Sequence, residues 1–150
     1  MFHEVVDGGG PGPAVDPDEP TAAGLLAAFE ALVTEAASAV GTDRLVDEVG
    51  LAEADAAAVR EGNVEELALA DAAAVLAAAE PDRDADAMVA EVRDHLLMGM
   101  ATAVLDVDTI AAKIDADLTG QEVQQALEGR TAMTLGQLAE IVAVIERRKR

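Results

Sequence analysis

Hydrophobic residues recur every three or four positions along most of the chain, which is the period of a helix with one buried face. The first such stretch begins at Thr21, the expected N-cap of a helix that runs to about Val40 and ends at Gly41. Further helices are expected over residues 43–49, 52–61, 67–79 and 84–105. Residues 1–20 hold four of the five prolines and show no such period, so we expect a disordered acidic tail there.

Three short helices are expected within residues 107–145. The first has Asp108 as its expected N-cap. The second opens on Thr119 and Glu122, which have the spacing of a capping box, and ends at Gly129, which can adopt the left-handed conformation of a helix end. The residues expected to face inward on these two helices are Ile110, Ala111, Ile114, Val123, Ala126 and Leu127.

A third helix is expected to start at Thr134 and to carry a wide apolar face, formed by Leu135, Leu138, Ile141, Val142 and Ile145. In order, the three segments read TIAAKI, TGQEVQQALEG and TLGQLAEIVAVI. This succession resembles the Cro/C1-type (lambda repressor-like) helix-turn-helix family. The resemblance implies a DNA-binding transcription regulator in which residues 119–129 form the recognition helix of the major groove.

The two halves of the chain follow one plan, a long helix and then three shorter ones. Residues 37–40 (ASAV) correspond to residues 101–104 (ATAV), and other matches give offsets of 64 to 67 residues. We predict an internal repeat from an ancient tandem duplication, with a degenerate helix-turn-helix-like unit over residues 21–80 and a second unit over residues 81–150. Chance similarity between two alanine-rich halves is the alternative.

Composition favours an all-α fold. Apolar residues make up 51% of the chain, yet Phe2 and Phe29 are the only aromatics. The core must therefore consist of small aliphatic side chains, as in closely packed helices. We expect the two long helices to share this core, with Gly24 and Gly99 allowing a close approach.

Charge separates the two halves. The chain has a net charge of −20, from 30 acidic and 10 basic residues. It resembles the uncharacterised acidic proteins of haloarchaea, whose halophilic surfaces are adapted to molar salt. Residues 1–104 hold 22 acidic and 4 basic residues, whereas residues 105–150 hold 8 and 6. Only the second half is therefore expected to approach a phosphate backbone.

Lys113 and Arg130 lie where the helix-turn-helix family contacts the DNA backbone, and four more bases end the chain. Those four bases are equally suited to complement the negative end of a helix dipole. Gln and Glu on the expected recognition helix can hydrogen-bond adenine and cytosine edges, although any solvated helix carries such residues. The candidate DNA-binding residues are Lys113, Thr119, Gln121, Glu122, Gln124, Gln125, Arg130, Arg147, Arg148, Lys149 and Arg150.

Other chemistry is not indicated. Asp82, Asp84 and Asp86 have the spacing that opens a calcium loop, but glycine is missing from the sixth position and Arg93 occupies the twelfth. The chain has no cysteine, and His95 is the one histidine outside the tail. We therefore expect no metal site, no cofactor and no catalytic residue.

Two functions remain for this expected non-enzyme. One is DNA-binding transcription regulation, and the other is a helical protein–protein adaptor whose helix-turn-helix fold no longer binds DNA. The N-terminus lacks the features of a signal peptide, and the apolar run over residues 96–105 is too short to span a bilayer, so we expect a cytoplasmic protein without a membrane partner. A chain with two such units could bind two half-sites alone, but the degenerate first unit favours a homodimer that presents two copies of the second unit.

Overall fold

The structure, a computed structural model, describes residues 21–80, 82–114 and 117–148. Within these residues the chain forms eight helices and no strand, which confirms the predicted all-α fold. In chain order the helices are α2 (Ala22–Val40), α3 (Thr42–Asp47), α4 (Glu53–Glu61), α5 (Leu69–Ala79), α6 (Ala85–Ala103), α7 (Val107–Lys113), α8 (Gly120–Leu127) and α9 (Leu135–Arg148). The expected tail, residues 1–20, lies outside the described residues.

Several helix ends follow the predicted capping residues. The Thr21 hydroxyl accepts the backbone N–H of Gly24 at 3.0 Å and starts α2, and Gly41, with φ +90°, follows the last residue of that helix. At the start of α9, Thr134 and Gln137 exchange hydrogen bonds of 3.0 and 3.1 Å. These are the reciprocal bonds of a capping box, so local hydrogen bonding sets where these helices begin.

Two predicted boundaries differ from the structure. Asp106, and not Asp108, is the N-cap of α7, because its carboxylate accepts the backbone N–H of Thr109 at 2.8 Å. The backbone N–H of Thr109 lowers the pKa of Asp106 below its usual value, and a hydrogen bond from the Thr109 side chain lowers it further. The helix α6 ends at Ala103 rather than at residue 105, since Val104 adopts a left-handed φ of +56°.

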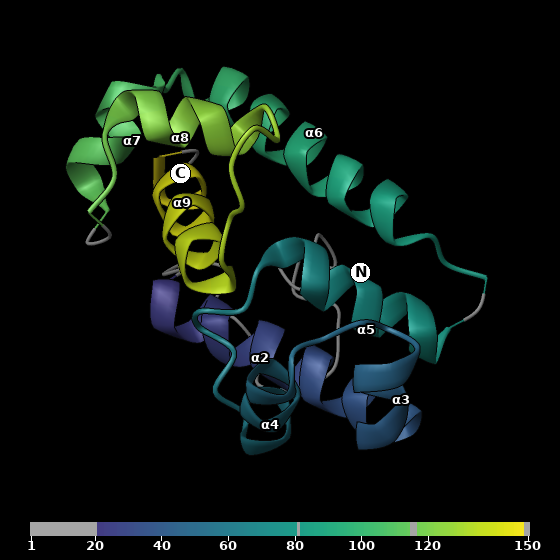
Figure 1. Cartoon of the computed structure of the whole chain (residues 1–150). Coiled ribbons are helices and arrows are strands. Elements are labelled where there is room, and N and C mark those ends of the chain that lie inside the picture. Colours follow the sequence, from purple (N-terminus) through teal and green to yellow (C-terminus); the bar gives the residue numbers. More distant parts are fainter. Residues whose placement is uncertain (1–20, 81, 115–116, 149–150) are drawn as a thin grey trace.

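The two halves, α2–α5 and α6–α9, interlock. Each long helix, α2 or α6, packs against both α5 and α9, so each contacts the last helix of the other half (Figure 1). Gly99 of α6 faces α9, where an added Cβ would lie 2.8 Å from Cγ2 of Ile145. Neither glycine brings the two long helices together as predicted, because Gly99 faces α9 rather than α2 and the neighbour of Gly24 is the hydroxyl of its own cap, Thr21.

A two-way backbone bridge joins equivalent points of the halves. The N–H of Leu69 donates to the carbonyl of Met133 at 2.6 Å, and the N–H of Leu135 donates to the carbonyl of Leu67 at 2.9 Å. Ala68 and Thr134, the residues that the bridge pairs, directly precede the last helix of each half and are 66 positions apart, within the predicted offset of 64 to 67 residues. The bridge also explains why α5 begins at Leu69 and not at the predicted residue 67. Its position agrees with a tandem duplication, which stays a prediction.

One apolar core runs through both halves. By length and composition α2 could cross a membrane, which the sequence analysis did not anticipate. Its apolar side chains, however, include the fully buried Leu25, Phe29 and Val33, and the helix packs on α5 and α9. This arrangement is consistent with a core helix of a soluble protein.

Candidate nucleic-acid interface

The inner face of α8 fixes which of its residues reach the surface. Gly120 is buried because Asp108 of α7 occupies the space that a side chain at position 120 would need. Gln121 is exposed, whereas Gln125, which the sequence placed on the outer face, is half-buried. The residues predicted to face inward on α8, namely Val123, Ala126 and Leu127, are all buried.

Several candidate base-reading side chains are engaged within the helix itself. The predicted capping box is present: the Thr119 hydroxyl accepts the N–H of Glu122, and the Glu122 carboxylate accepts the N–H of Thr119, both at 3.1 Å. Gln124 donates from Nε2 to Oε1 of Glu128 at 2.9 Å. Contact with a base edge would have to replace these hydrogen bonds, so the outer face of α8 has limited capacity for direct readout.

Three candidate bases gather at the ends of two helices. Lys113 ends α7, while Arg147 and Arg148 end α9. Together with Val144 they line a hollow of about 330 Å³, called the basic hollow below. The negative ends of the two helix dipoles partly offset the repulsion among these cations. The result is a compact positive surface in a chain whose net charge is −20.

Arg130 lies apart from the basic hollow. Its Nε donates to Oε2 of Glu128 at 3.1 Å, and its side chain is 74% exposed. Figure 1 shows the turn that follows α8 at the opposite end of that helix from α7. The structure therefore divides the described candidate bases between the two ends of α8. The remaining two, Lys149 and Arg150, lie outside the described residues.

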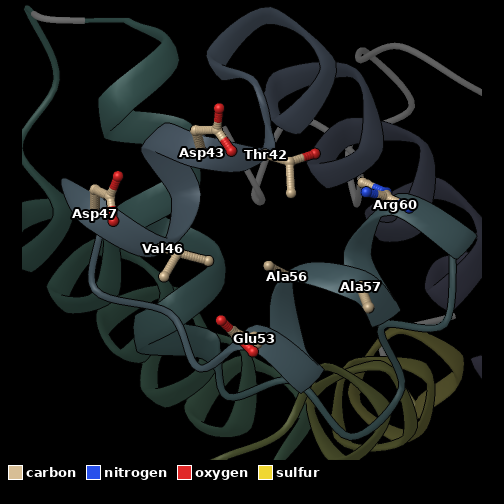
Figure 2. A pocket seen from close by; sticks show the side chains of 8 residues that line it. All are labelled: Thr42, Asp43, Val46, Asp47, Glu53, Ala56, Ala57 and Arg60. Atoms are coloured by element: carbon tan, nitrogen blue, oxygen red, sulfur yellow. The ribbon is translucent and has the colours of Figure 1, made fainter.

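The first half contains a hollow of the same volume, about 330 Å³, between α3 and α4 (Figure 2). We call it the acidic hollow, and it is lined by Thr42, Asp43, Val46, Asp47, Glu53, Ala56, Ala57 and Arg60. Three carboxylates, those of Asp43, Asp47 and Glu53, outnumber the single base Arg60. Coulombic repulsion makes this hollow unsuited to a phosphate backbone.

A second electrostatic feature of the first half lies where α4 and α5 approach. Burial raises the pKa of Asp71, in the first turn of α5, and the charge of Asp55 on α4 raises it further. The equivalent residue of the second half, 66 positions later, is the uncharged Gln137. The second half thus lacks a carboxylate at the position equivalent to Asp71.

Comparison with known protein families assigns the sequence to one of them. Residues 25–148 match a family described as a family of unknown function, DUF5791. The chain belongs to this family. No curated protein and no solved structure matches this chain. The DUF5791 region includes nearly all of the described helices and therefore both hollows.

One base of the DUF5791 chain escaped the sequence analysis. Arg93 of α6 places its guanidinium against Gly129, directly after α8. In the sequence it lies in the strongly acidic first 104 residues and was considered only as part of a failed calcium loop. In the described part of the DUF5791 chain, no group of three or more histidine, aspartate or glutamate side chains is placed to hold a metal ion.

Proposed function

We propose that this chain is a non-enzymatic, cytoplasmic transcription regulator that binds DNA through its second half. The convergence of Lys113, Arg147 and Arg148 on one hollow carries the proposal. Cations at such a surface neutralise phosphates and release counterions, which supplies most of the sequence-independent affinity of a DNA-binding protein. In this proposal the helix-turn-helix resemblance of α7, α8 and α9 reflects a shared way of presenting α8 to DNA.

The contacts of α8 support the proposal that different residues supply the affinity and the sequence specificity of DNA binding. α8 packs on α7, and α7 packs on α9, so the helix is held beside the elements that carry the basic hollow. Because Glu122 and Gln124 are already hydrogen-bonded, we propose that phosphate contacts supply most of the affinity. The exposed Gln121 is then the principal base-reading side chain.

The test is fluorescence anisotropy of labelled genomic duplex fragments, titrated with the intact chain from about 0.1 to 1 M KCl. The variant Lys113→Gln/Arg148→Gln removes two bases from the basic hollow. The matched control, Arg44→Gln/Arg60→Gln, removes two exposed bases from the first half and changes the net charge equally. We expect the salt slope of log K to fall in magnitude by about 1.8 in the first variant, at roughly 0.9 per lost contact, and to be unchanged in the control.

Equal losses in the two variants would show that net charge alone governs binding and would overturn the assignment to the basic hollow. A lack of binding by the intact chain across the salt range would overturn DNA binding altogether. Thermal unfolding of each variant, followed by circular dichroism, verifies that the fold is retained.

An exposed apolar face on α6 favours the second candidate function, a protein–protein adaptor. Leu97, Met98 and Val104, at the C-terminal end of α6, are 50%, 71% and 83% exposed. Clustered apolar side chains of this kind often mark an interaction surface. Sedimentation of the intact chain and of Met98→Glu tests whether the partner is a second copy: a dimer that the substitution abolishes supports it, and a monomer at all concentrations contradicts it.

A further inference from the structure

The two halves place a charged side chain over the same turn. Gly62 and Gly129, which follow α4 and α8, have φ angles of +80° and +79°. A Cβ on Gly62 would lie 2.6 Å from Oε1 of Glu30, and a Cβ on Gly129 would lie 2.7 Å from Cζ of Arg93. Glu30 and Arg93 are each the ninth residue of a 19-residue helix. The contacts are therefore equivalent, but their charges are opposite.

This equivalence separates the packing role of the side chain from its charge. A glutamate covers the turn at Gly62, so covering such a turn requires no positive charge. Both helix ends have a cation near the negative end of the dipole, Arg60 in the last turn of α4 and Arg93 over Gly129, but only in the second half does the side chain that covers the turn carry the positive charge. Within residues 21–80, 82–114 and 117–148 Arg93 makes no ion pair. Its charge thus adds to that of Arg130, the next residue after Gly129.

We infer that Arg93, together with Arg130, forms a second phosphate contact at the C-terminal end of α8, and that the nucleic acid bound is B-form duplex DNA. This inference rests on the proposed function and specifies its ligand. Arg130 is available for such a contact because its exposed pair with Glu128 is of a kind that contributes little stability. Arg93 is half-buried, and its guanidinium lies against Gly129, next to Arg130 in the chain.

The dimensions of α8 favour duplex DNA. The N-terminal end of α8 lies against α7, which carries Lys113, and Gly129 at its other end lies against Arg93 of α6. A helix with its side chains is about 10–12 Å across, so α8 can enter the major groove of B-DNA, which is about 12 Å wide. Cations at the two ends of α8 can then contact phosphates that border this groove.

Other nucleic acids fit this arrangement less well. The major groove of A-form RNA is deep and narrow and does not admit side chains from a helix. A single strand offers one phosphate backbone, so it can occupy one end of α8 but has no second strand for the other. The two-ended arrangement of bases is thus selective for a duplex with a wide groove.

The experiment compares labelled duplex DNA, the same sequence as a single strand, and the corresponding duplex RNA, each titrated with the full chain at several KCl concentrations. Arg93→Gln is the test variant and Arg93→Lys keeps the charge. Arg83→Gln is the matched control, because it removes one exposed base just before α6. We expect Arg93→Gln to weaken duplex DNA binding several-fold and to lower the salt slope by about 0.9. Arg93→Lys should restore the slope, and Arg83→Gln should leave it unchanged.

Each outcome bears on a different statement. If the intact chain binds duplex DNA but Arg93→Gln has the wild-type salt slope, the second contact is overturned while the proposed function stands. If the single strand or duplex RNA binds as tightly as duplex DNA, the assignment to B-form duplex is overturned. If the intact chain binds none of the three, the proposed function fails first. If Arg93 only stabilises the fold, Arg93→Gln will lower the thermal midpoint of unfolding without changing the salt slope of DNA binding.

Discussion

The first and second halves of this protein share a helix order and a turn geometry but differ in the charge of one hollow in each half and of the side chain that covers one equivalent turn. The acidic hollow lies between α3 and α4, and the basic hollow lies between α7 and α9. Glu30 covers one equivalent turn and Arg93 the other. Buried apolar residues and left-handed glycines specify the fold in both halves. Surface charges have been free to differ, because most surface substitutions change stability by no more than about 0.5 kcal/mol.

The largest effects are expected where the halves are alike. Leu45 of α3 and Ile110 of α7 are both fully buried. We expect Leu45→Ala and Ile110→Ala each to lower the free energy of unfolding by about 2–5 kcal/mol, because each leaves a cavity. Since one core connects the halves, both variants should still unfold in a single transition. Denaturant unfolding followed by circular dichroism measures this, and a two-step curve for either variant would show that the halves are independent.

Helix capping should give an intermediate effect that distinguishes the halves. Thr119 caps α8 with its side chain, whereas Ala52, at the start of α4, has no side-chain hydrogen bond to offer. We expect Thr119→Ala to cost about 1 kcal/mol and Ala52→Thr to add up to about 1 kcal/mol. Thr131→Ala, at an exposed threonine outside any helix, is the control. A loss in the control equal to that of Thr119→Ala would contradict the capping explanation.

The smallest effect concerns the crowded carboxylates of the first half. Burial and the charge of Asp55 raise the pKa of Asp71, so its charged form is disfavoured in the folded state. The stability linked to its protonation is present below the ordinary aspartate pKa of 3.8 and is lost as the pH rises through the raised pKa of Asp71. Asp71→Asn should therefore raise the thermal midpoint slightly at pH 7 and not near pH 3. An equal gain at both pH values would rule out this linkage.

Much of the fold could be predicted because its signals are local. The spacing of Thr119 and Glu122, and the glycines at positions 41 and 129, predicted helix ends that the structure has. The N-cap of α7 was misplaced because Asp106 and Asp108 both precede the same apolar stripe. The start of α5 depends on hydrogen bonds to residues 133 and 135, which no local pattern contains.

The candidate site was predictable in charge but not in geometry. The excess of acid over residues 1–104 drew attention to Lys113, Arg147 and Arg148, which the structure places around one hollow. Their convergence depends on α7 packing against α9, which the sequence does not specify. Arg93 was missed because its equivalence to Glu30 depends on three-dimensional contacts: Glu30 lies against Gly62, and Arg93 lies against Gly129.

The backbone bridge between the halves also bears on how the chain is made. When Leu67 and Leu69 leave the ribosome, the groups that they bond near Met133 and Leu135 have not been synthesised. At about 5–20 residues per second they follow several seconds later. During that interval the faces of α2 and α5 that α9 and α6 will cover are open to water. The first half therefore cannot complete its packing until α6 and α9 have been synthesised.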